Sequence, residues 1–162
     1  MRELSLKLRM QRVNAAREAP SVAAATAVTG YGANVEIMTG AGPAHVVLDK
    51  PARQPAFLVV LTHGAGGRPD TPDVLAARDA AREFGAVTAL VTQPYRVRGA
   101  RAPGSVVKQD AAWTEIVSSL NAGNLPLVQG GRSNGARVAA RWWRPARRNT
   151  SPPSRRATPV SS

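Results

Sequence analysis

The sequence LPLVQGGRSNGARVAARW, which spans residues 125–142, decides the fold. Its first part, 125–128, is an apolar run that suits a buried strand, and its last part, 134–142, is alanine-rich and suits a helix. Between them lies a G-x-S-x-G pattern, formed by Gly131, Ser133 and Gly135. The pattern alone is a weak signal, but a strand before it and a helix after it together predict a sharp strand-to-helix turn.

Such a turn indicates nucleophilic chemistry at Ser133. The serine takes a strained backbone conformation that lifts its hydroxyl above the sheet, and glycines two positions away on each side avoid a collision. The N–H groups at the start of the following helix point toward the same place. We therefore expect Ser133 to be the nucleophile and the N–H of Asn134 to stabilise a developing oxyanion.

The preceding residues alternate between strand and helix patterns, which is typical of an α/β domain. Apolar runs predict strands at 35–38, 44–48, 57–61, 87–91 and 125–128. Helices are expected at 73–84 and 106–120, and a loop at 93–105. The expected inward faces are Val74, Ala77, Ala81 and Phe84 in the first helix, and Trp113, Ile116, Val117 and Leu120 in the second. Short connections favour a mostly parallel sheet with flanking helices.

A second glycine-rich segment supports the same chemistry. The sequence HGAGG at 63–67 follows the strongest apolar run and begins 70 residues before Ser133. A loop in this place supplies the second oxyanion donor, for which the N–H of Ala65 or of Gly64 is the candidate. His63 is expected to orient this loop; its alternative role, a general base, would require a hydrogen bond to the serine hydroxyl.

These segments resemble the α/β-hydrolase family, in particular its dienelactone-hydrolase-like esterases and their Tex30/KANSL-like branch. The resemblance rests on LTHGAGG at 61–67, VTQPYR at 91–96 and GGRSNGARVAA at 130–140, and it covers about residues 35–140. It implies the strand order 1-2-4-3-5-6-7-8 and a triad of serine, acid and histidine with Ser133 as nucleophile. It does not imply a known substrate, and the first hypothesis for the function is a hydrolase of esters, thioesters or lactones, or an inactive relative of one.

The acid and the histidine of such a triad have no counterpart after Ser133. The family's chain order places both well beyond the serine, yet the last acidic residue is Glu115 and the two histidines are His45 and His63. We therefore expect a partial, C-terminally truncated or frameshifted α/β-hydrolase fold that lacks the last strands. Its activity should be absent or weak, because a serine hydroxyl without a base is a poor nucleophile.

Charge and composition divide the chain into three parts. Residues 1–32 are expected to be a poorly ordered basic extension, with a basic membrane-surface or targeting helix as the alternative. Residues 33–143 carry the hydrolase-like domain, and 144–162 are expected to be a disordered Arg/Pro/Ser-rich tail. The net charge is +12, and residues 141–162 contain six arginines and no acidic residue. A non-catalytic binding module whose tail contacts polyanions is thus the alternative function.

Several other classes of site lack support in the sequence. The chain has no cysteine, which excludes disulfides and thiolate metal sites and fits a cytoplasmic location. No membrane-length apolar run and no nucleotide-binding glycine motif occur, so we expect no metal, no cofactor and no membrane contact. The tail lacks interleaved aromatics and order, so any binding of nucleic acid or another polyanion would be independent of sequence and steeply salt-dependent, and nucleic acid is not the expected partner. The expected partners are a small ester-like substrate and a second copy, bound through an exposed edge strand at 125–128.

The remaining charged residues near the two motifs have alternative interpretations. Arg132 and Arg137 either bind a substrate carboxylate or are solvated. Asp70 and Asp73 are expected to flank the helix that follows the glycine-rich loop.

Overall fold

The computed structural model describes residues 32–121 and 125–143. The predictions of a basic extension and of an arginine-rich tail therefore lie outside the described residues, apart from Gly32. The helices and strands in the described ranges are, in chain order, β1 (Ala33–Thr39), β2 (Gly42–Asp49), β3 (Phe57–Thr62), α3 (Pro72–Glu83), β4 (Ala86–Thr92), α4 (Pro94–Val97), α5 (Val106–Leu120), β5 (Leu127–Gly131) and α6 (Asn134–Trp142).

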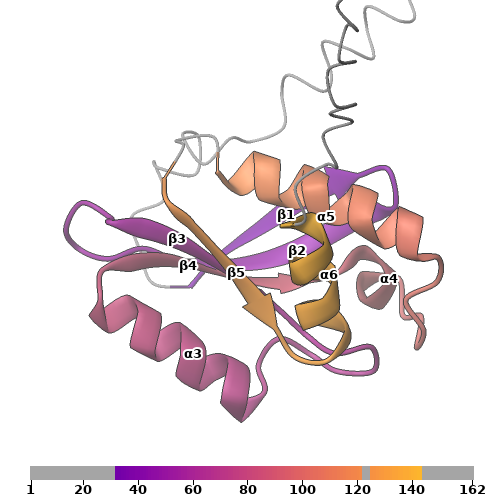
Figure 1. Ribbon diagram of the computed structural model, residues 1–162, viewed down its shortest axis with the longest axis horizontal. Coiled ribbons are helices and arrows are strands. Elements are labelled where there is room, and N and C mark those ends of the chain that lie inside the picture. The colour runs from indigo at the N-terminus through magenta and orange to yellow at the C-terminus, as the bar shows by residue number, and fades with distance from the viewer. Residues whose placement is uncertain (1–31, 122–124, 144–162) are drawn as a thin grey trace, which may run out of the picture.

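The strands form one mixed sheet in the order β1-β2-β4-β3-β5, as the resemblance implies for the first five strands (Figure 1). β1 and β2 pair antiparallel, because the two residues Gly40 and Ala41 that join them can connect only antiparallel neighbours. β2 also pairs antiparallel with β4. Parallel pairing is confined to β4, β3 and β5, whose carboxyl ends therefore meet at one edge of the sheet.

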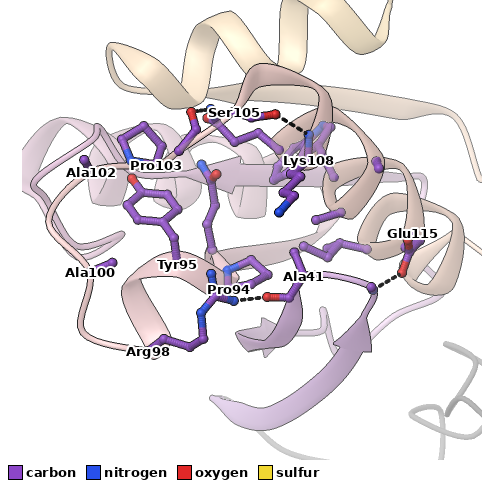
Figure 2. A pocket seen from close by; sticks show the side chains of 18 residues that line it. Ala41, Pro94, Tyr95, Arg98, Ala100, Ala102, Pro103, Ser105, Lys108 and Glu115 are labelled. Carbon is purple, nitrogen blue, oxygen red and sulfur yellow. Dashed lines mark hydrogen bonds between the residues drawn. The ribbon is translucent and has the colours of Figure 1, made fainter.

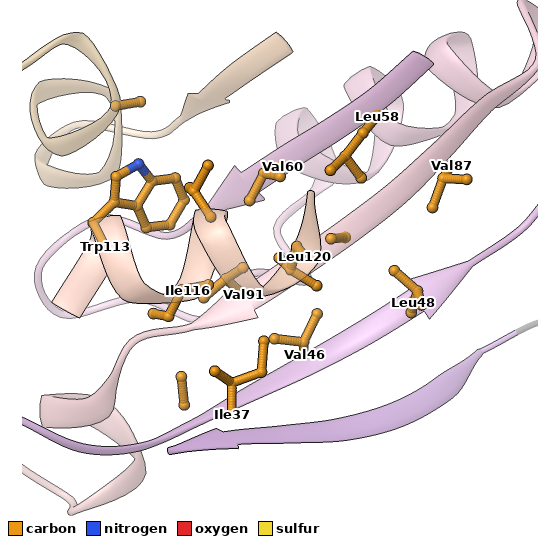
Figure 3. Packing of buried hydrophobic residues seen from close by; sticks show 14 of the residues in the cluster. Ile37, Val46, Leu48, Leu58, Val60, Val87, Val91, Trp113, Ile116 and Leu120 are labelled. Atoms are coloured by element: carbon orange, nitrogen blue, oxygen red, sulfur yellow. The ribbon is translucent and has the colours of Figure 1, made fainter. Parts of the chain in front are cut away.

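Helices cover both faces of the sheet, with α3 on one face and α5 and α6 on the other (Figure 1). Successive side chains of a strand point to opposite faces, so Leu58 and Val60 face α5 whereas Val59 and Leu61 face α3. Figure 3 shows the larger cluster, in which Trp113, Ile116 and Leu120 of α5 pack on the strands. The predicted inward face of this helix is thus confirmed: Trp113, Ile116, Val117 and Leu120 are all buried.

The prediction for the inward face of the earlier helix is wrong at two positions. Val74 of α3 is buried as predicted, but Ala77 is exposed and Phe84 is 75% exposed. Phe84 follows the last residue of α3 with φ −83° and ψ 6°, so it no longer continues the helical face. Leu75 takes part in the packing instead, at the border of the smaller cluster.

The predicted loop at 93–105 contains the four-residue helix α4. Pro94 occupies its first turn, where the missing N–H of proline costs no hydrogen bond. A single turn is too short to produce a helical periodicity in the sequence, which explains why the pattern did not predict it. None of the helices in the described ranges is long and apolar enough to span a membrane.

Candidate active site

Ser133 lies in the sharp bend between β5 and α6, with φ 50° and ψ −108°. Among the described residues it is the one non-glycine with a positive φ. A conformation of this kind costs on the order of 1–3 kcal/mol and persists only where the surroundings impose it. Here the Arg132 N–H donates to the Thr62 carbonyl at 3.1 Å, and the Gly135 N–H donates to the Arg132 carbonyl at 2.9 Å. The bend therefore has the strand–turn–helix geometry that the sequence predicts, and Ser133 is exposed.

Close backbone approach explains both glycines of the pattern. A Cβ on Gly131 would lie 2.3 Å from the Thr62 carbonyl oxygen, and one on Gly135 would lie 2.7 Å from the His63 carbonyl oxygen. Both distances are far below van der Waals contact. Both nearest atoms belong to the backbone, so they cannot move away by a change of side-chain rotamer. The backbone at the end of β3 thus packs closely against the bend. No residue larger than glycine fits at Gly131 or Gly135 without a shift of the backbone.

The glycine-rich loop after β3 contacts the bend. A Cβ on Gly64 would lie 3.4 Å from the Cβ of Ser133. Within the loop, the Gly67 N–H donates to the Gly64 carbonyl at 3.1 Å. The structure therefore brings together the segments that carry Ser133, Asn134, Gly64 and Ala65. The use of the Asn134 and Ala65 N–H groups as oxyanion donors stays a prediction.

His63 is held in one tautomer at the centre of this arrangement. Its ring is fully buried; Nδ1 donates to the Gly64 carbonyl at 2.7 Å, and Nε2 accepts from the Gln93 N–H at 3.0 Å. Because a backbone carbonyl only accepts and a backbone N–H only donates, the ring is neutral with its proton on Nδ1. Burial lowers the pKa of His63, which favours the same neutral form. Both ring nitrogens are engaged, so the ring cannot accept a proton from Ser133 in this arrangement.

No base contacts the serine in the part of the chain that the structure describes. His45 lies exposed on β2, where its Nε2 is 3.3 Å from Oε2 of Glu36. Two charged residues lie beside the bend at the surface: Nε of Arg132 is 3.7 Å from Oδ2 of Asp73. The pKa of Asp73 is lowered, chiefly by the hydroxyl of Thr71 and to a smaller extent by Arg132. The described residues contain no cluster of histidine and carboxylate side chains that could hold a metal ion.

The predicted positions of the two aspartates near this loop agree with the structure. Asp73 lies in the first turn of α3, next to the N-cap residue Thr71, and Asp70 precedes that cap and pairs with Arg68 at 3.1 Å. Of the two arginines near the serine, Arg132 approaches Asp73, and Arg137 is exposed on α6.

Two residues that the sequence reasoning did not single out hold the site together. The Tyr95 hydroxyl, on α4, donates to the Ala65 carbonyl at 2.8 Å. The Asn134 side-chain amide donates to Gln109 Oε1 of α5 at 2.9 Å, and Gln109 Nε2 donates to the Gly104 carbonyl at 3.2 Å. The available signal for Tyr95 is its place in a Gln-Pro-Tyr segment directly after a buried strand. Nothing in the sequence around Gln109 distinguishes it from an ordinary helix residue.

A second contact between α5 and α6 fixes the helix that follows Ser133. The Arg141 Nε donates to both carboxylate oxygens of Asp110 at 2.9 Å. The two helices are thereby tied at the start and at the end of α6.

Comparison with known proteins gives the fold. No protein-family model and no curated protein matches the chain. Among solved structures, an α/β serine hydrolase homologue from Coxiella burnetii aligns with TM-score 0.58 and 17% identity over 70% of this chain. An α/β serine hydrolase without a lid from Xanthomonas campestris aligns with TM-score 0.56 and 20% identity over 71% of this chain. Dienelactone hydrolase from Anabaena variabilis aligns with TM-score 0.54 and 19% identity over 67% of this chain.

The chain is shorter than these structures. It spans 58% of the Coxiella protein, 56% of the Xanthomonas protein and 54% of the Anabaena protein. At these identities the likeness shows the fold alone: the described residues form the first five strands of an α/β-hydrolase sheet.

Proposed function

Starting from the α/β-hydrolase fold, we propose that Ser133 is the nucleophile of a serine-hydrolase site for esters, thioesters or lactones. The N–H groups of Asn134 and Ala65 are its oxyanion donors. The observation that carries the proposal is the backbone of Ser133, strained at φ 50° and fixed between two glycines that admit no side chain. Strain of this kind concentrates at functional sites, where it directs a side chain to the chemistry. Kinship with the dienelactone-hydrolase-like esterases and the Tex30/KANSL-like branch is part of this proposal.

The same proposal includes a weak activity for this chain. Neither nitrogen of His63 is available as a base, and residues 134–162 contain no histidine, aspartate or glutamate. Oxyanion donors and substrate binding alone leave a residual acceleration of about 10³–10⁴ over water in serine proteases that lack triad residues. We therefore expect slow acylation of Ser133 by activated esters and no efficient turnover.

The test is an acylation assay with p-nitrophenyl acetate. Nitrophenolate release is followed at 400 nm on the full chain, and the acetylated residue is located by peptide mass spectrometry. Ser133→Ala should abolish the slow release and the acetyl adduct, whereas Ser118→Ala, at an exposed position of α5, should retain both. Equal release from Ser133→Ala and the original chain would exclude Ser133 as the nucleophile.

A non-catalytic binding module is the second candidate, favoured by the missing base and by the six arginines without an acidic residue at 141–162. Contacts to a polyanion would then weaken steeply with salt, because each neutralised phosphate releases counterions. Removing residues 144–162 should abolish retention on a heparin column at 50 mM salt. Unchanged retention would count against this candidate.

Location and self-association complete the proposal. The absence of cysteine supports a reducing compartment such as the cytoplasm. A second copy is the proposed partner of β5, which pairs with β3 on one side and with no other strand among the described residues. A hollow beside this edge is lined by Val128, Ala136, Ala140 and Trp143, and Trp143 is 72% exposed.

A further inference from the structure

A cavity in the described part of the chain is separate from the serine. Its volume is about 610 Å³, and it lies between the β1–β2 turn, α4, the segment 98–105 and α5 (Figure 2). This size suits a small molecule. Ser133 is not among the lining residues, and the cavity therefore needs its own explanation.

One wall of the cavity is apolar. Its apolar lining includes Pro94 and Tyr95 of α4, Pro103, and Trp113 and Ile116 of α5. Tyr95, Trp113 and Ile116 are each buried, so they form a fixed surface rather than mobile side chains. A ligand that fills this space gains free energy by covering apolar surface.

The charged groups of the cavity leave one cation without a partner. The Arg98 guanidinium donates to the Ala41 carbonyl, and the Glu115 carboxylate accepts from the Gly40 N–H at 2.8 Å. These two opposite charges are thus both engaged with the β1–β2 turn. Lys108 forms no ion pair within the described ranges. In Figure 2 its side chain extends from α5 toward the space in front of Pro94 and Tyr95.

From this arrangement we propose that the cavity binds a small organic carboxylate, with the carboxylate on the Lys108 ammonium and the apolar body against Tyr95 and Pro94. The lining carries two positive groups and one negative group, so its net charge of +1 suits a monoanion better than a phosphate dianion. The apolar wall favours a ligand with a hydrophobic body over a simple inorganic ion.

The cavity shares residues with the contacts that hold the serine site. Tyr95 lines it and donates to the Ala65 carbonyl, and Gln109 lines it and accepts from the Asn134 side chain. A bound carboxylate would thus contact the reverse side of the groups that position the bend and the glycine-rich loop. Binding itself does not require Ser133 to react, so this proposal can fail or succeed independently of the proposed hydrolase activity.

The test is a titration of the full chain with benzoate and with benzyl alcohol, its neutral counterpart, followed by the fluorescence of the tryptophans and by calorimetry. Benzoate should bind at millimolar or lower concentration and benzyl alcohol at least about tenfold more weakly, because only benzoate carries the negative charge that forms an ion pair with the Lys108 ammonium. Lys108→Met should weaken benzoate binding about tenfold and leave benzyl alcohol unaffected. Lys108→Arg should restore most of the affinity for benzoate.

Arg101→Met provides the matched control, because Arg101 is an exposed cation in the segment 98–105 beside the cavity but does not line it. It should bind benzoate like the original chain. Lys108 is exposed on a helix and methionine has a similar helix propensity, so Lys108→Met should fold normally, which far-UV circular dichroism verifies. Equal affinity of Lys108→Met and the original chain for benzoate, or no binding of benzoate at 10 mM, would overturn the proposal.

Discussion

Gly135 is a helix residue at which the site is sensitive to a single added atom. In a helix, alanine normally stabilises relative to glycine by up to about 1 kcal/mol. At Gly135 the added Cβ would instead lie 2.7 Å from the His63 carbonyl oxygen and 2.8 Å from the Thr62 carbonyl oxygen. We expect Gly135→Ala to reduce the free energy of unfolding by about 1–3 kcal/mol, the usual cost of overpacking.

Urea denaturation measures this change, and Gly66→Ala is its control. A Cβ on Gly66 would meet no atom within 4 Å, so this variant should change the free energy of unfolding by less than about 0.5 kcal/mol. A higher free energy of unfolding for Gly135→Ala would mean that the end of β3 does not pack closely against the bend.

His63 should make the stability of the chain depend on pH below neutrality. Burial lowers its pKa below the ordinary value of 6.5, so the unfolded chain binds this proton at a higher pH than the folded chain does. The stabilising effect of the neutral ring is therefore complete above pH 6.5 and is lost as the pH falls below that value. For one group the slope is at most about 1.4 kcal/mol per pH unit.

Urea denaturation at pH 7.5, 6.5 and 5.5 checks this expectation. His63→Gln should lose this part of the pH dependence, whereas His45→Gln, which leaves the buried ring in place, should keep it. If the free energy of unfolding falls between pH 7.5 and pH 5.5 as much in His63→Gln as in the original chain, the pH dependence belongs to other groups.

The residues of the candidate site differ in how far the sequence could predict them. Ser133, Gly131 and Gly135 lie within five consecutive residues, so a local motif with its flanking elements predicts their turn. Tyr95 and Gln109 act through contacts to residues 30 and 25 positions away. Such contacts depend on the three-dimensional packing of α4 and α5, which no local pattern encodes.

At the scale of elements, the exposed edge of β5 should drive self-association. An unpaired strand edge is a template for pairing with another chain, and Val128 in β5 is 52% exposed. We expect Val128→Lys to raise the dissociation constant of the dimer about tenfold or more, because a lysine on the edge opposes close strand pairing. Sedimentation velocity at several protein concentrations gives this constant.

Val107→Lys is the control for this prediction. Val107 is 77% exposed but lies on the helix α5 and not on β5, so Val107→Lys should leave the dissociation constant unchanged. Identical effects of the two lysines would indicate association driven by general surface hydrophobicity. A monomer at all concentrations would exclude the edge as an interface.

The elements themselves followed from sequence patterns wherever these were long enough to show a period. All five strands and three of the helices occur within a few residues of the predicted ranges. The single turn of α4 and the end of α3 at Phe84 were missed, because both depend on local backbone geometry rather than on periodicity. The order of the strands came from the family resemblance, since hydrophobic patterns do not specify which strands become neighbours.

At the scale of the whole molecule, the two faces of the sheet should contribute unequally to stability. Ile116 is fully buried in the larger cluster under α5 and α6, whereas Val74 of α3 lies in the smaller cluster on the other face. We expect Ile116→Ala to cost about 3–4 kcal/mol and Val74→Ala about 1.5–2.5 kcal/mol, from the methylenes removed and the cavity left. Chemical denaturation of both variants tests this, and a larger loss for Val74→Ala would reverse the assignment of the main core.

The hydrogen bond from the Tyr95 hydroxyl to the Ala65 carbonyl also restricts rotation of the peptide units in the glycine-rich loop. In a trans peptide the N–H points opposite to the carbonyl of the same unit. The Gly64 carbonyl is bound by His63 and the Gly67 N–H, and the Ala65 carbonyl is bound by the Tyr95 hydroxyl. A flip of either peptide would break these bonds, so the N–H groups of Ala65 and Gly66 keep their direction. For the proposed oxyanion donor Ala65, this preorganisation would spare the reaction the cost of reorienting its N–H group.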